Sequence, residues 1–277
     1  MLIDSHAHVN FNAYQEDGDE VIKKCLDNDV WVVNVGSEFK TSQRAVEYAN
    51  RYNEGVYAIV GLHPIHVLVK DRDEGADVNN EDIKYREEFN YQKYFELAKD
   101  KKVVAIGEVG LDYHHFDEGL TESEKEKIIE KQKEIFIEFI KIANEVGKPV
   151  AIHCWGAYKD LIEIFRANPV DKKGIIHSFT GSYKTAREFR ELGFKLSFNG
   201  IITYSESYDK VIKDTPIEDI LIETDCPYLN PSPLDRYGRN EPMNVGYVLE
   251  KISELKEMDI SEVEKIVEKN TRGVLGI

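Results

Sequence analysis

Eight short runs of Val, Ile and Leu recur along the 277-residue chain, and most are followed by a longer amphipathic segment. Such runs are typical of parallel strands buried on both faces. The runs are Leu2–His6, Trp31–Val35, Val56–Gly61, Val103–Gly107, Pro149–His153, Gly174–His177, Phe194–Phe198 and Ile220–Asp225. Strands that alternate with helices predict an α/β protein, a (β/α)8 TIM barrel that forms a single domain over residues 1–277. An open doubly wound sheet is the alternative, but no run is followed by a GxGxxG or phosphate-binding loop.

The segments between the runs carry recognisable helix signals, with one exception. Thr121 and Glu124 form the capping-box pattern of a helix start, and Gly147 marks the end of that helix. The exception is a polar, acidic stretch at about residues 70–92, before a helix expected at Tyr94–Lys99. We interpret it as a solvated surface insertion; the alternative is a lid over the C-terminal face of the barrel.

The charge balance narrows the classes of partner. Lys and Arg total 36 against 52 Asp and Glu, which gives a net charge of −16. This charge argues against a polybasic nucleic-acid binder and against a membrane-surface protein. No apolar run approaches the ~18 residues of a membrane span, and the polar start does not read as a signal peptide. Nothing in the sequence points to a stable protein partner.

The cysteines indicate a reducing compartment. There are three, Cys25, Cys154 and Cys226, so one is unpaired under any scheme, and none forms a CxxC motif. We therefore expect a cytoplasmic protein with the three thiols packed in the core.

Metal-ligating residue types stand at the ends of five predicted strands. Active sites of TIM barrels collect at these ends, and alternate residues of one strand share a face. Four of the eight histidines in the chain are among them. Any one of these residues could instead be a hydrogen-bonded structural group or a helix cap, but together they converge. The six are His6, His8, Glu108, His153, His177 and Asp225.

Four imidazoles and two carboxylates are too many ligands for one tetrahedral ion. They suit two divalent ions, about 3.5–4 Å apart, that share a carboxylate. The donor set is compatible with Zn²⁺, Mn²⁺, Ni²⁺ or Co²⁺, and Mg²⁺ is kept as a further option.

Seven motifs along the chain resemble the TatD family of metal-dependent deoxyribonucleases, which are amidohydrolase-like TIM barrels. The matches run in order from residue 1 to past residue 240, and the set is specific although each motif alone is weak. They are LIDSHAHV in Met1–Val9, GLHP in Gly61–Pro64, GEVGLDY in Gly107–Tyr113, IHC in Ile152–Cys154, HSFTGS in His177–Ser182, ETDCPYLNP in Glu223–Pro231, and RNEP in Arg239–Pro242.

The resemblance implies a role for each ligand. His6 and His8 would hold the first metal, His153 and His177 would hold the second, and Glu108 would bridge the two. Asp225 would bind the first metal and handle the proton of the attacking water, which makes Asp225 and Glu108 the expected catalytic residues.

The expected surroundings of these ligands leave more alternatives open. Asp4 and Glu223 would each orient a ligand imidazole or bond a neighbouring backbone N–H. A substrate role is expected for His63, Arg239 and Tyr113. The family places such a histidine near the substrate, the guanidinium can grip a phosphate and the phenol ring can stack on a base. The alternatives are a structural turn at His63, a helix start for the RNEP segment, and core packing for Tyr113. For Asp112 we favour a turn-stabilising role.

The resemblance implies a DNA or oligonucleotide substrate, whereas the net charge of −16 opposes a long polyphosphate. We therefore expect an exonuclease-like preference for single-stranded or short DNA, with a shallow salt dependence. The first alternative is an amidohydrolase-type enzyme that cleaves a small ester, amide or lactone. The second is a non-catalytic metal-binding barrel, which the absence of a closed site made of four cysteine thiolates disfavours.

Overall fold

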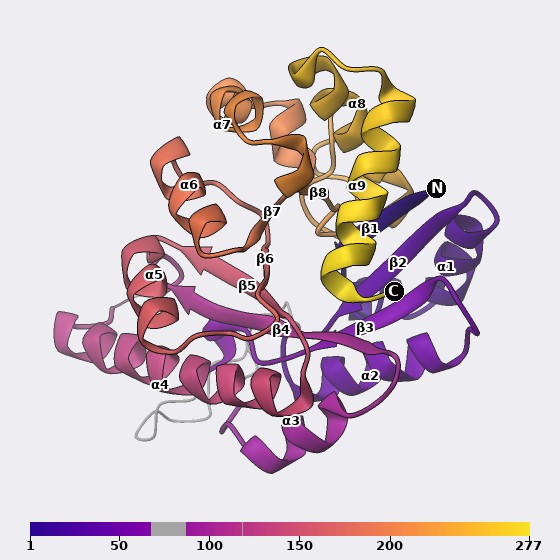
Figure 1. Ribbon diagram of the computed structural model, residues 1–277. Coiled ribbons are helices and arrows are strands. Elements are labelled where there is room, and N and C mark those ends of the chain that lie inside the picture. Colours follow the sequence, from indigo (N-terminus) through magenta and orange to yellow (C-terminus); the bar gives the residue numbers. More distant parts are fainter. Residues whose placement is uncertain (68–86, 118) are drawn as a thin grey trace.

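The computed structural model describes residues 1–67, 87–117 and 119–277 of the chain. Within these residues, parallel strands follow one another around one eight-stranded sheet in the order β1 to β8, with helices on the outside (Figure 1). The strands are β1 (Leu2–Ala7), β2 (Val30–Val35), β3 (Val56–Val60), β4 (Val103–Asp112), β5 (Val150–Trp155), β6 (Gly174–Ile176), β7 (Lys195–Phe198) and β8 (Ile220–Ile222).

The helices of the described residues connect these strands. The α-helices are α1 (Gly18–Leu26), α2 (Phe39–Asn50), α3 (Tyr91–Ala98), α4 (Glu122–Val146), α5 (Tyr158–Ala167), α6 (Tyr183–Glu191), α7 (Asp209–Asp214), α8 (Val245–Lys256) and α9 (Ile260–Leu275). The short 3-10 helices are η1 (Asn12–Tyr14), η2 (Pro64–His66), η3 (Gly200–Thr203), η4 (Glu206–Tyr208), η5 (Ile217–Asp219) and η6 (Pro242–Asn244). None of these helices is long and apolar enough to cross a membrane.

Hydrogen bonds between β1 and the segment after β8 bring the two ends of the sheet together. The backbone N–H of Asp225 donates to the carbonyl of His6, and the N–H of His8 donates to the carbonyl of Cys226, both at 2.9 Å. The hydroxyl of Ser5 also donates to the carbonyl of Ile222 at 2.9 Å. The predicted single-domain (β/α)8 barrel is therefore confirmed.

Two apolar layers stabilise the barrel. The larger lies between the strands and the surrounding helices, and the smaller fills the inside of the barrel. Full burial of each such Val, Leu or Ile side chain contributes roughly 1.5–3 kcal/mol. Outside β4, the inner layer takes residues on one side of each strand and so tells which face points inward. In β4 the adjacent Val104 and Ala105 both belong to it, where the pairing with β3 shifts register. The buried members of the inner layer are Ile3, Val33, Val35, Ile59, Val104, Ala105, Ala151, Ile175, Leu221 and Leu275.

The helices and the cysteines can be compared with the remaining predictions from the sequence. The capping box at the start of α4 is confirmed, since Glu124 N–H donates to the Thr121 hydroxyl and Thr121 N–H donates to the Glu124 carboxylate. Helix α3 begins at Tyr91, so the predicted helix start at Tyr94 was wrong. The predicted insertion, at about residues 70–92, lies outside the described residues as far as residue 86 and stays a prediction. The three cysteines are buried and unpaired, as predicted.

Candidate metal centre

The structure brings the six predicted ligands together at the carboxyl ends of the strands. We call His6, His8, Glu108, His153, His177 and Asp225 the ligand cluster. Every member is buried or nearly so; the most exposed side chains are Asp225 at 17% and His153 at 13%. The cluster therefore lies inside the barrel mouth, with Asp225 and His153 at its open side.

Glu108 is the centre of the cluster, and its two carboxylate oxygens face different histidines. Oε2 lies 3.4 Å from Nε2 of His6 and 3.9 Å from Nε2 of His8. Oε1 lies 3.1 Å from Nδ1 of His153 and 3.0 Å from Nε2 of His177. The carboxylate thus divides the four imidazoles into two pairs, one for each oxygen.

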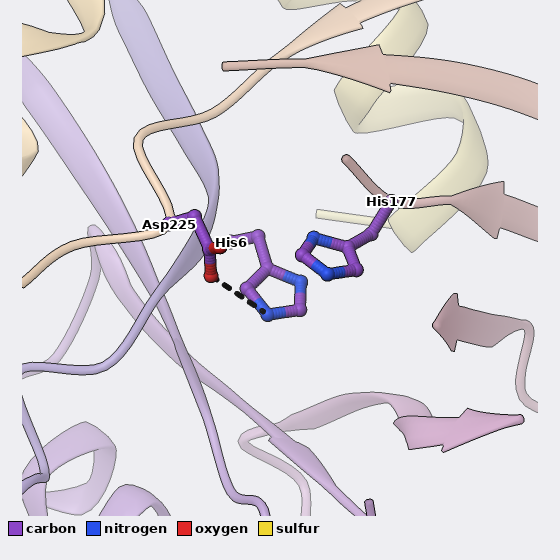
Figure 2. Close-up of side chains that lie close together, drawn as sticks. All are labelled: His6, His177 and Asp225. Carbon is purple, nitrogen blue, oxygen red and sulfur yellow. Dashed lines mark ion pairs between the residues drawn. The ribbon is translucent and has the colours of Figure 1, made fainter. Parts of the chain in front are cut away.

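Asp225 completes the first pair. Its Oδ1 atom lies 3.2 Å from Nε2 of His8 and 3.8 Å from Nε2 of His6. In Figure 2 the rings of His6 and His177 lie face to face, with centroids 3.8 Å apart, and Asp225 lies on the side of His6. Glu108 and Asp225 therefore contact the same two imidazoles, His6 and His8.

An irregularity in β1 turns the first two histidines inward. Ile3 belongs to the inner apolar layer, so strict alternation would place His6 and His8 on the outer face. The pairing of β1 with β2 shifts register between Asp4 and Ala7. Register shifts of this kind re-aim side chains next to active sites, and here the shift points both imidazoles into the barrel.

Strand β4 contains a second register shift that has the same effect on Glu108. Counted from Ala105, the inner residue that follows the irregular pairing with β3, strict alternation would turn Glu108 outward. The register shifts between Ile106 and Val109 and carries Glu108 to the inside. On β5 and β6 the inner positions of Ala151 and Ile175 lead to His153 and His177 by simple alternation.

The carboxylates of the cluster are held in their charged form. Burial acts to raise the pKa of Glu108, but the neighbouring imidazoles, above all His63 and His177, outweigh it and hold the pKa well below its usual range. Burial opposes ionisation of Asp225 too, and the hydrogen bond from His8 with the charges around it lowers that pKa. Two anionic oxygen donors in a buried site favour a bound cation.

The imidazoles present nitrogen atoms that suit a metal ion. Nδ1 of His8 donates to the carbonyl of Val35 at 2.8 Å, so Nε2, which lies 3.2 Å from Oδ1 of Asp225, is the nitrogen that would face a metal ion. Nε2 of His6 is buried and has no hydrogen-bond partner among the described residues. Burial lowers the pKa of His6, so this ring is neutral. An orphaned imidazole nitrogen beside two carboxylates fits a divalent ion better than any structural role does.

Glu223 and Asp112 hold the second pair of imidazoles from behind. Oε1 of Glu223 lies 3.0 Å from Nδ1 of His177 and accepts the Ser178 N–H at 2.8 Å. Oδ2 of Asp112 lies 3.0 Å from Nε2 of His153. Such partners fix the orientation of a ligand ring and increase its basicity. Burial opposes the charged form of His177, but Glu223 and Glu108 outweigh it and raise its pKa.

Asp4 follows the backbone-bonding alternative, and its Oδ1 atom accepts the N–H of His6 at 3.3 Å. Its carboxylate accepts the backbone N–H of Thr224 at 2.9 Å and the hydroxyl of Thr224 at 2.5 Å. Burial raises the pKa of Asp4 to about 8. Asp4 therefore connects β1 to the segment after β8, which is the backbone-bonding alternative.

The role of Asp112 was underestimated from the sequence. It does stabilise a turn, since Oδ1 accepts the N–H groups of His114 and His115, both at 2.8 Å. It also orients His153, and its own N–H donates to buried Gln132 of α4 at 3.0 Å. Asp112 lies four residues after Glu108 on the same face of β4. Because the strand was expected to end at Gly107, the sequence offered no reason to place both carboxylates on one face.

His63 faces the cluster as a hydrogen-bond donor. Its Nδ1 accepts the N–H of Ile65 at 3.2 Å, which leaves the proton of the neutral ring on Nε2. Nε2 lies 3.4 Å from Oε1 of Glu108. Burial, helped by the charge of His153, lowers the pKa of His63 to about 4, so the ring is neutral near pH 7. His63 therefore presents an N–H, and not a lone pair, to the site.

Arg239 and Tyr113 have other partners than the predicted substrate. Both arms of the Arg239 guanidinium donate to Asp17, at 2.8 and 2.6 Å, and the group lies over the ring of Tyr14. The hydroxyl of Tyr113 donates to Asp160 at 2.9 Å. The Asp17 contact opposes a phosphate contact of Arg239, whereas the hydroxyl bond of Tyr113 does not bear on stacking of its ring. The substrate roles of both residues stay predictions.

Comparison of the chain with known proteins identifies its family. The family model described as TatD related DNase matches residues 3–276. The chain is 38% identical to the uncharacterized metal-dependent hydrolase YabD of Bacillus subtilis, over 100% of both chains. It is 30% identical to the uncharacterized metal-dependent hydrolase MJ1582 of Methanocaldococcus jannaschii, over 97% of this chain and 94% of the other.

A solved structure has the same fold. The crystal structure of YJJV, a TatD homolog from Escherichia coli K12, superposes with a TM-score of 0.81 at 24% sequence identity. The match covers 100% of this chain and 98% of the other.

Proposed function

The chain belongs to the TatD-related DNase family of metal-dependent hydrolases, and from this premise we propose that it hydrolyses phosphodiester bonds in DNA with two divalent metal ions. We propose further that it removes nucleotides from the ends of single-stranded or short DNA. The observation that carries the proposal is the division of four imidazoles between the two oxygens of Glu108. One carboxylate with a separate pair of histidines on each oxygen is a donor arrangement that suits two ions with a shared ligand.

We assign the six proposed ligands to two metal positions. His6, His8 and Asp225 would hold the first ion, and His153 and His177 would hold the second, with Glu108 common to both. Ions held there would act as Lewis acids that lower the pKa of water and neutralise charge on the phosphodiester. The identity of the ions is open among Zn²⁺, Mn²⁺, Mg²⁺, Ni²⁺ and Co²⁺.

Asp225 and His63 would act on the reactants. Asp225 is the most exposed ligand and keeps an ionised carboxylate, so it can orient the attacking water and accept its proton. His63 presents an Nε2 proton near Oε1 of Glu108 and can donate it to a non-bridging phosphate oxygen in a hydrogen bond. A neutral donor in this position does not compete with the ligands for metal.

The charge of the molecule supports the preference for short substrates. A net charge of −16 repels a long polyanion, and the one predicted arginine contact is occupied by Asp17. A strand end needs few phosphate contacts and is the least repelled part of a nucleic acid.

Digestion of labelled oligonucleotides tests the proposal. The metal-loaded protein is incubated with 5′- and 3′-labelled single-stranded DNA, with long duplex DNA, and with a panel of esters, amides and lactones. We expect stepwise shortening of the single strand, abolished by a chelator and by Glu108→Gln. Hydrolysis of a small ester or amide with intact oligonucleotides would contradict the nuclease assignment and favour the alternative. Unchanged activity of Glu108→Gln would contradict the two-ion site itself.

A further inference from the structure

A partly exposed tryptophan lies next to the ligand cluster. Trp155 is the last residue of β5, two positions after His153, and 48% of its surface is exposed. Ala151 faces the barrel interior, so Ala151, His153 and Trp155 follow one another on the same side of the strand. The indole therefore lies above a metal ligand, toward the open end of the barrel.

Two histidines at the end of β4 pack against this indole. The ring of His114 stacks on it, with centroids 4.8 Å apart and planes at 9°, and the ring of His115 meets it edge-on at 5.0 Å. We call Trp155, His114 and His115 the aromatic platform. The backbone N–H of Tyr113 donates to the carbonyl of Trp155 at 2.9 Å and joins the two strand ends beneath it.

A single carboxylate positions the platform relative to the metal centre. Asp112 accepts the N–H groups of His114 and His115 on Oδ1, and its Oδ2 lies 2.8 Å from Nδ1 of His115. The same Oδ2 lies 3.0 Å from Nε2 of the ligand His153. The aromatic platform and His153 thus bond the same buried carboxylate. This shared contact restricts the distance between a group bound on the platform and a group bound at the ligand cluster.

We propose that the aromatic platform stacks a nucleobase of the DNA strand whose phosphodiester lies at the ligand cluster. The inference rests on the proposed function and adds to it the source of substrate affinity. A strongly acidic chain gains little from phosphate contacts, whereas stacking of a base on an aromatic face is insensitive to charge and to base identity. A base is accessible in this way in a single strand or a frayed end, and is not accessible inside a duplex.

Tryptophan fluorescence provides a direct test, because the chain has two tryptophans. Trp31 is at the start of β2, where its ring packs against Tyr57 and Arg272, and serves as the matched control. The metal-loaded protein is titrated with a phosphorothioate oligothymidylate, which resists hydrolysis. We expect quenching in the wild type and in Trp31→Phe, and none in Trp155→Phe. Quenching that persists in Trp155→Phe would overturn the proposal.

Binding and kinetics with abasic substrates separate stacking from a structural role. Using a labelled oligonucleotide, we expect Trp155→Ala to weaken binding about 10-fold or more, with Trp155→Phe retaining most of the affinity. A single abasic nucleotide, moved along the substrate, should raise the KM of the wild type at one position and leave the KM of Trp155→Ala unchanged there. Metal content and melting temperature should match the wild type in both variants.

The outcomes also distinguish this inference from the function on which it rests. If the wild type shortens the oligonucleotide but Trp155→Ala has the same KM and the same response to abasic positions, the platform is wrong and the proposed function stands. If the wild type neither binds nor shortens any oligonucleotide, both are wrong.

Discussion

At the scale of single residues, the site depends on which atom of each side chain is free to bind. Hydrogen bonds determine which nitrogen faces the cluster in His8 and His63. Nδ1 of His8 donates to the carbonyl of Val35, and Nδ1 of His63 accepts the N–H of Ile65. The first bond leaves Nε2 of His8 as the nitrogen that faces the cluster, and the second leaves the proton of the neutral His63 ring on Nε2. We therefore expect these two buried histidines, one after β1 and the other after β3, to differ in role, as a metal ligand and as a hydrogen-bond donor.

Loss of the Glu223 carboxylate should weaken metal binding. Glu223→Ala removes the partner of His177 Nδ1 and should lower metal affinity about 10–100-fold. Titration of the metal-free protein with Zn²⁺ or Mn²⁺ measures this. Glu87→Ala is the matched control, because Glu87 accepts hydrogen bonds from Phe39 and Tyr94 but touches no ligand imidazole. Equal metal affinity in the two variants would refute the positioning role of Glu223.

Removal of the His63 ring should affect catalysis without affecting metal content. His63→Ala should bind as much metal as the wild type and show a kcat/KM lower by about 100–1,000-fold, the usual range for one positioned hydrogen-bond donor. Metal analysis and steady-state kinetics on an oligonucleotide measure the two effects, with His153→Ala as the metal-losing comparison. Loss of metal from His63→Ala would identify His63 as a ligand, against the tautomer deduced above.

At the scale of elements, the eight strands and the ligand types were readable from the sequence, whereas the register shifts were not. Runs of branched apolar residues mark β1 and β4, but nothing in LIDSHAHV or VVAIGEVGLD shows where alternation is interrupted. Strand β4 runs to Asp112 because Gly110 adopts a φ of +143°, which lets the backbone continue alongside His153 of β5. The conformation of a glycine depends on its neighbours in space, so the role of Asp112 became visible only in the fold.

A side chain at Gly110 should damage both the strand pairing and the site. A Cβ atom there would overlap the carbonyl oxygen of His153, and the φ of Gly110 is unfavourable for an L-residue. We expect Gly110→Ala to lower the free energy of unfolding by about 3 kcal/mol or more and to weaken metal binding. Denaturant unfolding with metal titration measures both. Gly246→Ala on α8, where a Cβ meets nothing within 4 Å, is the control. Wild-type stability of Gly110→Ala would refute this account of β4.

At the scale of the whole molecule, a cation-binding centre lies in a strongly acidic protein. The net charge of −16 is spread over the chain, while the ligand cluster and its partners concentrate four carboxylates, Glu108, Asp112, Glu223 and Asp225, in the barrel mouth. Bound divalent ions would reverse the sign of the potential only locally. For the proposed DNA substrate, we therefore expect recognition to be confined to a few nucleotides near the metal centre.

The salt dependence of binding tests this confinement. With few phosphate contacts, the slope of log K against log salt for a single-stranded oligonucleotide should have a magnitude of about 2 or less. Fluorescence anisotropy across a range of salt concentrations measures the slope. A magnitude of about 4 or more, as expected for six phosphate contacts on a single strand, would contradict an end-binding mode.

Anomalous diffraction from crystals grown with Mn²⁺ can locate the two divalent ions proposed around Glu108. We expect two anomalous peaks on opposite oxygens of Glu108, one next to His6, His8 and Asp225 and the other next to His153 and His177. The absence of peaks there, or a peak held by a different set of side chains, would contradict the two-ion proposal.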